Sequence, residues 1–189
     1  MVTPHVNPPG RPYPVRYVKS WTMKDETRVT MRPIRPEDEP FMVKFHETLS
    51  DHTVYMRYFC SMSFAARTAH ERLCRICHCD YERVMVLVAE YTDFQSGESQ
   101  IVGVGRLNRL PADGDAEVAV LVSDQYQHRG LGTELVRELI SFARDEKVSR
   151  VVAEMLRDNL LIQNTLGRLG FRFHAVPNHP GSIQAVLEL

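Results

Sequence analysis

A strand that leads through a glycine-containing turn into a long amphipathic helix is the feature that most constrains the fold of this sequence. Apolar side chains alternate over residues 116–122, which predicts a strand. Gly130 and Gly132 then open a stretch reaching Val148 in which apolar residues recur at helical spacing. N–H groups at a helix N-terminus lack intrahelical partners and carry partial positive charge, and glycine has no Cβ to block close approach. The sequence therefore predicts an anion-binding loop built mostly from main chain.

This glycine loop (residues 127–133) does not match the better-known phosphate-binding patterns. One residue separates its two glycines, and no third glycine follows where the dinucleotide fingerprint needs one. The loop also lacks the Gly-Lys-Ser/Thr ending of a P-loop. Taken alone, it therefore leaves open a second interpretation, in which the helix start simply requires glycine.

The remaining apolar patterns predict the other elements of a mixed fold. Period-two or continuous apolar runs indicate strands, and the 3.6-residue period indicates helices. The expected order is strand, two helices, three strands, helix, strand, helix and two strands, which is an α/β (α+β) fold with a mostly antiparallel sheet of six to seven strands and four helices. Strands are expected near residues 28–32, 83–89, 101–107, 116–122, 151–155, 171–175 and 183–189, and helices near 36–49, 65–77, 130–148 and 159–169.

Composition and length narrow the class of protein. The 189 residues fit one domain, which we place at residues 16–189, behind a proline-rich tail or linker at residues 1–15. A net charge of −1 argues against a nucleic-acid binder that relies on a strongly basic surface. No apolar run reaches the roughly 18 residues of a membrane span, and residues 1–16 contain no signal-peptide core. With only four cysteines, we expect a cytoplasmic protein without a membrane or nucleic-acid partner.

A cysteine and histidine cluster, Cys74-x-x-Cys77-His78-Cys79, invites a zinc interpretation because thiolates and imidazole suit that metal. The cluster stands alone at the end of an expected helix, and three consecutive side chains converge poorly on one ion. Buried thiols beside a surface histidine are the more ordinary interpretation. We therefore predict no metal site.

Two landmarks resemble those of the GNAT superfamily of N-acetyltransferases. Gln127-x-x-Gly130-x-Gly132 is similar to that family's Gln/Arg-x-x-Gly-x-Gly/Ala motif, and Asn159 followed by residues 169–171 (Leu-Gly-Phe) is similar to its second landmark. The order of elements over residues 28–189 is also similar to the family's fold. The resemblance implies that the anion is the pyrophosphate of acetyl-CoA.

A closer resemblance is to the acetyltransferase domain of bacterial Pat-type protein lysine acetyltransferases. It is carried by residues 31–39, 49–50, 55–59 and 80–83, and residues 13–28, with their tryptophan, resemble the lead-in to that domain. In that family the domain often follows a larger regulatory or synthetase-like region. We therefore expect either a stand-alone version or a fragment of a longer chain.

The resemblance assigns roles to named positions of the coenzyme site. The main chain of the strand before the loop is expected to bind the pantetheine arm, the loop the pyrophosphate, and Asn159 the region near the thioester. The strands at residues 116–123 and 151–155 are expected to splay apart around the pantetheine. The implied cofactor-binding residues are Val120, Leu121, Val122, Gln127, His128, Arg129, Gly130, Leu131, Gly132, Thr133 and Asn159.

The implied reaction, attack of an amine on the acetyl thioester, needs a proton acceptor. A lysine amine has an ordinary pKa near 10.4 and is mostly protonated at neutral pH, so a carboxylate is a suitable general base. We choose Glu117, which resembles the catalytic glutamate of related enzymes and which alternation points away from Val118 and Val120. An exposed strand carboxylate is the alternative role for Glu117, and Glu154 is the alternative base. Leu166 stands where many relatives have a tyrosine acid.

The expected activity is therefore transfer of an acetyl group from acetyl-CoA to a protein lysine, for example on an acyl-CoA synthetase. Within enzymes, acetylation of a small-molecule amine is the alternative. A non-catalytic acyl-CoA sensor that regulates another domain is the alternative from a different class.

Overall fold

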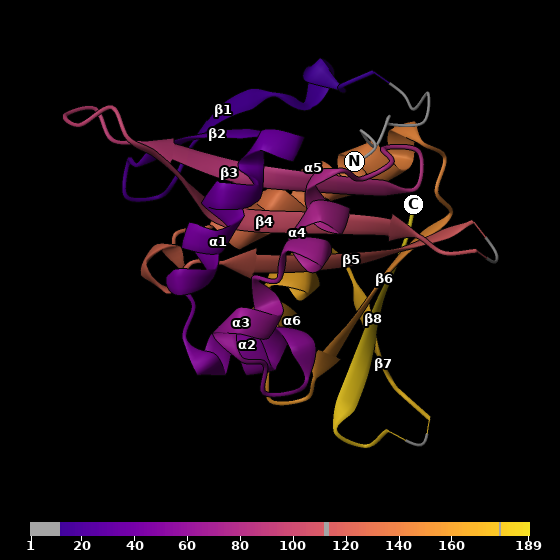
Figure 1. Cartoon of the computed structure of the whole chain (residues 1–189). Coiled ribbons are helices and arrows are strands. Elements are labelled where there is room, and N and C mark those ends of the chain that lie inside the picture. Colours follow the sequence, from indigo (N-terminus) through magenta and orange to yellow (C-terminus); the bar gives the residue numbers. More distant parts are fainter. Residues whose placement is uncertain (1–11, 112–113, 178) are drawn as a thin grey trace, which may run out of the picture.

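A computed structural model describes residues 12–111, 114–177 and 179–189 (Figure 1). Most of the expected proline-rich tail, residues 1–11, lies outside the described residues. The expected fold class is confirmed, because helices cover both faces of a mixed and mostly antiparallel sheet. The sheet has the strand order β1-β2-β3-β4-β5-β6-β8-β7. Its strands are β1 (Lys19–Thr22), β2 (Arg28–Pro33), β3 (Val84–Thr92), β4 (Ser99–Arg109), β5 (Asp115–Val122), β6 (Arg150–Leu156), β7 (Arg172–Ala175) and β8 (Ser182–Glu188).

The eight strands exceed the six to seven expected because β1 was not predicted. β1 has only four residues, which is too short for an alternating pattern to stand out. It pairs antiparallel with β2, and Trp21 lies opposite Val29. The lead-in segment therefore extends the sheet by one edge strand.

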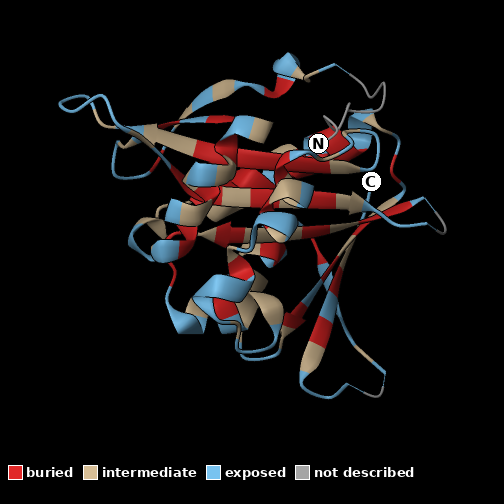
Figure 2. Cartoon of the chain, in the orientation of Figure 1, coloured by how far each residue is buried: buried red, intermediate tan, exposed pale blue. Residues whose placement is uncertain are grey.

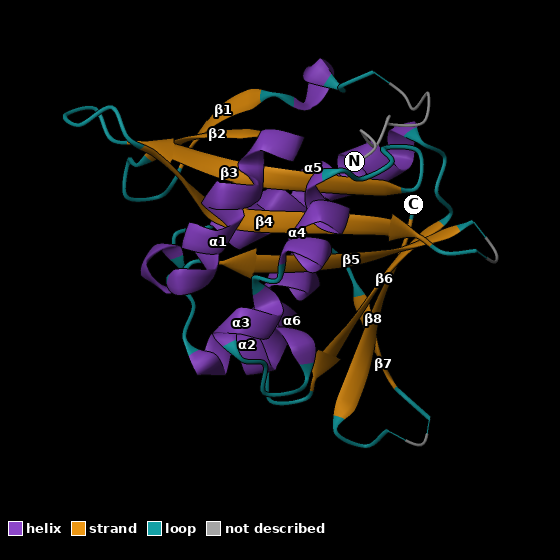
Figure 3. Ribbon diagram, in the orientation of Figure 1, coloured by secondary structure: helices purple, strands orange, loops and turns teal. Residues whose placement is uncertain are grey.

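The helices also outnumber the expected four (Figure 3). The expected helix at residues 65–77 is in fact two helices, and a further helix precedes them. Two of these helices begin at a serine whose Oγ accepts a hydrogen bond from the backbone, Ser50 from Thr53 N and Ser63 from Ala66 N, both at 3.2 Å. The helix that begins at His70 follows Ala69 and has no side-chain cap. The helices are α1 (Glu39–Glu47), α2 (Asp51–Tyr58), α3 (Phe64–Arg67), α4 (His70–Cys77), α5 (Leu131–Asp145) and α6 (Leu160–Arg168), with 3-10 turns η1 (Val15–Tyr17), η2 (Pro36–Asp38) and η3 (Asp124–Tyr126).

The sheet separates two hydrophobic clusters. Figure 1 shows α1 and α4 in front of the sheet and α5 behind it, and the central strands between them are buried in Figure 2. Gly103 and Gly105 let α5 approach β4 closely, because a Cβ on Gly105 would lie 2.9 Å from Cδ1 of Leu139. Alternation along β5 sends Val118 to the α5 cluster and Leu121 to the cluster under α1 and α4.

The one parallel pair of the described sheet, β5 with β6, is short. Residues 115–117 pair with residues 150–152, and beyond them the two strands diverge, as Figure 1 shows. β6 instead continues as the antiparallel partner of β8. The splayed strands that we expected from the sequence are therefore present, and they leave an opening beside the second half of β5.

Candidate acetyl-transfer site

The glycine loop begins α5 without a side-chain cap. His128 and Gly130 have positive φ angles of 61° and 90°, and Gly130 is the N-cap residue, with no side-chain hydrogen bond to the first turn. Within the described ranges, no acceptor is found for the N–H groups of Leu131, Gly132 and Thr133. Three main-chain donors at the positive end of a 15-residue helix make this loop a suitable anion site.

The turn between β1 and β2 covers the glycine loop, which the sequence analysis missed. The backbone N–H of Lys24 donates to the carbonyl of Arg129 at 3.2 Å, and Asp25 forms an ion pair with the Arg129 guanidinium. A Cβ on Gly130 would lie 3.6 Å from both Trp21 and Lys24. The turn thus brings an exposed ammonium, that of Lys24, to the loop that is expected to bind phosphate.

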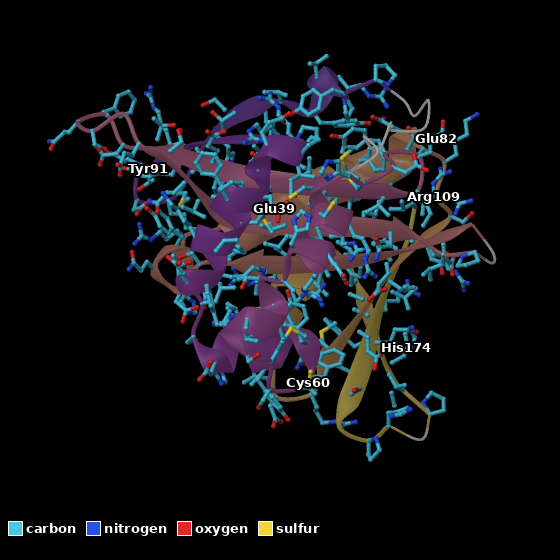
Figure 4. The ribbon with its side chains drawn as sticks, in the orientation of Figure 1. Glu39, Cys60, Glu82, Tyr91, Arg109 and His174 are labelled. Carbon is cyan, nitrogen blue, oxygen red and sulfur yellow. The ribbon has the colours of Figure 1, made fainter. Side chains whose placement is uncertain are left out.

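Gln127 anchors the other end of the loop. Its side-chain amide nitrogen donates to the carbonyl of Val122 and to Oγ1 of Thr53, both at 3.2 Å. These bonds tie the loop to the end of β5 and to α2. The ring of Tyr126, the residue before Gln127, contacts the ring of Tyr91, and the two ring centroids are 6.0 Å apart. The loop therefore lies at the end of the sheet where Tyr91 is labelled in Figure 4.

A cavity of about 1110 Å³ follows the opening between β5 and β6 down to the glycine loop. Two of the residues that we expected in it are elsewhere: the Leu131 side chain is buried in the core, and Arg129 is turned toward Asp25. Both residues belong to the glycine loop, and they contribute to its anion site through their main chain only. The expected residues that do line the cavity are Glu117, Val120, Leu121, Val122, Gln127, His128, Gly130, Gly132, Thr133 and Asn159.

Asn159 has a structural role that its sequence position did not reveal. Its Oδ1 accepts a hydrogen bond of 3.3 Å from the N–H of Ile162, which caps α6. Its Nδ2 donates to the carbonyl of Met56 in α2 at 3.5 Å. Asn159 therefore joins α6 to α2 across the wall of the cavity while also lining it.

A second cavity, of about 310 Å³, lies on the other side of β5 under α1, α2 and α4. Glu117 lines both cavities, and it lies opposite Asn108 in the pairing of β4 with β5. Glu154, the alternative base, lines only the larger cavity and is exposed. Glu117 is therefore the carboxylate at the junction between the two cavities.

Three arginines surround the second cavity, and the sequence analysis did not find them. Arg57 and Arg72 both stack on the ring of Tyr58, with Cζ at 5.1 and 4.9 Å from its centroid, and Arg106 projects from β4. Burial lowers the pKa of Arg57, and the charges of Arg106 and Arg72 add to this lowering, while Tyr58 and Glu117 oppose it. The guanidinium nevertheless stays charged at neutral pH.

Leu166 is buried with 1% of its surface exposed and belongs to the core cluster on the α5 side. It has no group that can donate a proton. In the cysteine and histidine cluster, Sγ of Cys74 lies 3.5 Å from Nδ1 of His78. Burial raises the pKa of Cys77 to about 12 and that of Cys79 to about 11. In the part of the chain that the structure describes, no three His, Cys, Asp or Glu side chains form a group that could hold a metal ion, and no helix is long and apolar enough to cross a membrane.

Comparison with known proteins gives the family to which this fold belongs. Residues 28–172 match the acetyltransferase (GNAT) domain family, so the chain belongs to that family. Acetyltransferase PA5475 of Pseudomonas aeruginosa is 29% identical over 150 residues, which are 79% of this chain and 78% of that protein. Acetyltransferase Pat of Mycolicibacterium smegmatis is 30% identical over 140 residues, which are 74% of this chain but only 40% of that protein.

Solved structures agree with this assignment. The GNAT domain of S. lividans PAT has a TM-score of 0.82 and 26% identity, covering 94% of this chain and 100% of that chain. Mycobacterium smegmatis RimJ in complex with CoA-disulfide has a TM-score of 0.72, covering 90% of this chain and 86% of that chain. Its identity is 16%, so it supports the fold alone.

Proposed function

We propose that this chain transfers an acetyl group from acetyl-CoA to the side-chain amine of a protein lysine. The observation that carries the proposal is the position of Glu117, the one carboxylate residue of the described chain that lines both the larger cavity and the second one. A two-substrate transfer needs such a junction, with the donor on one side and the acceptor on the other. The likeness to Pat acetyltransferases supports a protein lysine as the acceptor.

The donor side fits the chemistry of coenzyme A. The uncapped N–H groups of Leu131, Gly132 and Thr133 suit a pyrophosphate, and the exposed backbone of β5 beside the opening suits the amide groups of a pantetheine arm. When bound, acetyl-CoA supplies the activated acetyl thioester. RimJ, which shares the fold, has been solved in complex with CoA-disulfide.

Glu117 is the proposed proton acceptor. As the acceptor nitrogen forms its bond to the acetyl carbon and the carbon–sulfur bond breaks, Glu117 takes the proton that the amine loses, directly or through water. The sulfur leaves as a thiolate, a fairly good leaving group. Because Leu166 offers no hydroxyl, the reaction proposed here has no tyrosine acid at that position.

The test is transfer of labelled acetyl from acetyl-CoA to an acyl-CoA synthetase, with the modified side chains identified by mass spectrometry. We expect label on lysines of the native acceptor and none on an acceptor whose lysines have been dimethylated. Label on small amines alone would replace the protein acceptor by a small-molecule one. Tight acetyl-CoA binding by calorimetry without transfer to any amine would leave a non-catalytic sensor instead of an enzyme.

A further inference from the structure

The second cavity has an excess of positive charge that the transfer reaction by itself does not require. Arg57, Arg72 and Arg106 line it, and Glu117 supplies its one carboxylate among the described residues. No described carboxylate forms an ion pair with any of these three guanidinium groups. An incoming lysine ammonium would be repelled by them, so the arginines call for a different ligand group.

Arg32 is a buried guanidinium group with carboxylate partners and serves as a comparison. Arg32 donates to both carboxylate oxygens of Asp38 at 2.7 Å and to Glu90 at 2.7 Å. Such pairing is usual, because a buried charge without a partner is costly. Arg72, by comparison, has a buried Nε atom without any hydrogen-bond partner. Among the described residues, the Arg72 guanidinium thus lacks the carboxylate partners that Arg32 has.

His46 also lines this cavity, and Asn108 fixes the orientation of Arg106 in it. His46, 1% exposed, has an Nδ1 atom without a partner and lines the same cavity from α1. The Nε of Arg106 donates to Oδ1 of Asn108 at 2.7 Å, which fixes the Arg106 side chain on the face of β4 next to Glu117. The guanidinium groups come from α2, α4 and β4, so they surround the space instead of lying on one surface.

We propose that this cationic cavity binds a carboxylate of the acceptor, adjacent to the amine that Glu117 deprotonates. Guanidinium groups bind carboxylates with charge-assisted and often bidentate hydrogen bonds, and three of them over a 310 Å³ space match a carboxylate and its short side chain. The inference rests on the proposed acetyl transfer and names the acceptor class: a lysine with an acidic side chain beside it, or a lysine at a chain terminus with its own free carboxylate.

Bound in this way, the carboxylate neutralises the guanidinium charges that would repel an ammonium. Glu117 remains free to receive the proton, because it lies at the opening toward the larger cavity. The acceptor is therefore selected by its negative charge and activated by a different carboxylate.

The experiment uses short blocked peptides that each contain one lysine. In the first series, aspartate is placed in turn at each of the two positions before the lysine and each of the two positions after it, and a matching peptide has asparagine at the same position. In a further pair, the peptide ends in lysine, and its terminal carboxyl group is either free or amidated. Transfer is measured as kcat/KM. Binding of the acetylated product peptides in the presence of CoA is measured separately by calorimetry, so that binding does not depend on turnover.

The variants are Arg72→Gln and Arg106→Gln, with Arg72→Lys to restore charge without the planar guanidinium. Arg75→Gln is the matched control, because Arg75 is exposed on the same helix as Arg72 and does not line the cavity. We expect wild type and Arg75→Gln to favour at least one carboxylate peptide over its amide partner about tenfold or more. Both glutamine variants should reduce this preference to below about threefold, and Arg72→Lys should keep part of it.

The outcomes separate this inference from the proposed function. Turnover without any preference for a carboxylate, or a preference that survives both glutamine variants, overturns the carboxylate site and leaves the acetyltransferase proposal intact. Selective binding of carboxylate peptides without turnover overturns lysine acetylation and keeps the site. Peptides that neither bind nor react overturn both.

Discussion

Glu117 lies directly opposite Asn108 in the pairing of β4 with β5, and Oδ1 of Asn108 accepts a hydrogen bond of 2.7 Å from Nε of Arg106. These three polar residues lie beside the apolar cluster under α1 and α4. They are close to the last paired residues of β5 and β6, beyond which the two strands separate. The polar groups thus gather where the larger cavity and the second cavity meet.

Substitution of Glu117 tests its role as base. Glu117→Gln keeps the shape of the side chain but removes its ability to accept a proton, so we expect kcat for acetyl transfer to fall about 100-fold or more. The Kd for acetyl-CoA, measured by calorimetry, should stay within about twofold because the glycine loop is untouched. Glu154→Gln is the control, and its kcat should match wild type. Equal values of kcat in Glu117→Gln and wild type would exclude Glu117 as the general base and leave Glu154 as the candidate.

The strand, glycine loop and helix over residues 116–148 could be predicted from the sequence because each part has a strong local signal. The strand has a clear period of two, the helix has a wide apolar face, and two glycines mark the junction. The structure differs mainly at the helix ends, at Leu131 and Asp145. The splayed strands followed from family resemblance and not from periodicity.

The cationic cavity could not be predicted, because its residues come from separate elements. Arg57, Arg72 and Arg106 are ordinary polar residues in their local sequence, and only the fold brings α2, α4 and β4 around one cavity. The one available signal was weak: Arg106 and Asn108 are alternate polar residues at the end of an apolar strand. The serines at the starts of α2 and α3 were a similarly weak signal, because a serine in a sequence indicates a helix cap only when the following helix is already evident.

The buried ion pair between Arg32 and Asp38 should be important for stability. The Asp38 carboxylate contacts Arg32 and also accepts a hydrogen bond from the Arg35 N–H at 2.7 Å. Asp38→Asn leaves the Arg32 charge partly unpaired, so we expect the free energy of unfolding to fall by about 3 kcal/mol. Glu37→Gln removes an exposed neighbouring charge and should change it by less than about 0.5 kcal/mol. Similar values from urea unfolding of the two variants would contradict this role.

The close approach of α5 to β4 predicts a specific cost for a methyl group. Gly105→Ala places a Cβ 2.9 Å from Cδ1 of Leu139 and 3.4 Å from Cβ of Leu135, in a packed core. We expect the free energy of unfolding to fall by about 1–2 kcal/mol. Gly181→Ala is the control, since a Cβ there has no described atom within 4 Å. A thermal midpoint for Gly105→Ala at or above that of Gly181→Ala would show that the helix can move away without cost.

Buried His46 should make the protein less stable in mild acid. Burial, with Arg67 and Arg72 nearby, lowers the pKa of His46 from 6.5 to about 4. The unfolded chain therefore takes up a proton at His46 near pH 6.5, whereas the folded chain stays neutral there until about pH 4. The contribution of neutral His46 to the free energy of unfolding is therefore complete above pH 6.5 and is lost as the pH falls toward 4. The loss at pH 5 is about 2 kcal/mol.

Urea unfolding of wild type and His46→Gln at pH 7.5 and pH 5 measures this contribution. We expect wild type to lose about 2 kcal/mol more than His46→Gln between the two pH values, since glutamine does not titrate. His174→Gln is the matched control, because His174 is exposed on β7, at the lower right in Figure 4, and should leave the wild-type pH dependence unchanged. The same pH loss in wild type and His46→Gln would mean that His46 is already protonated in the folded protein at pH 5, which its enclosure among Arg67 and Arg72 opposes.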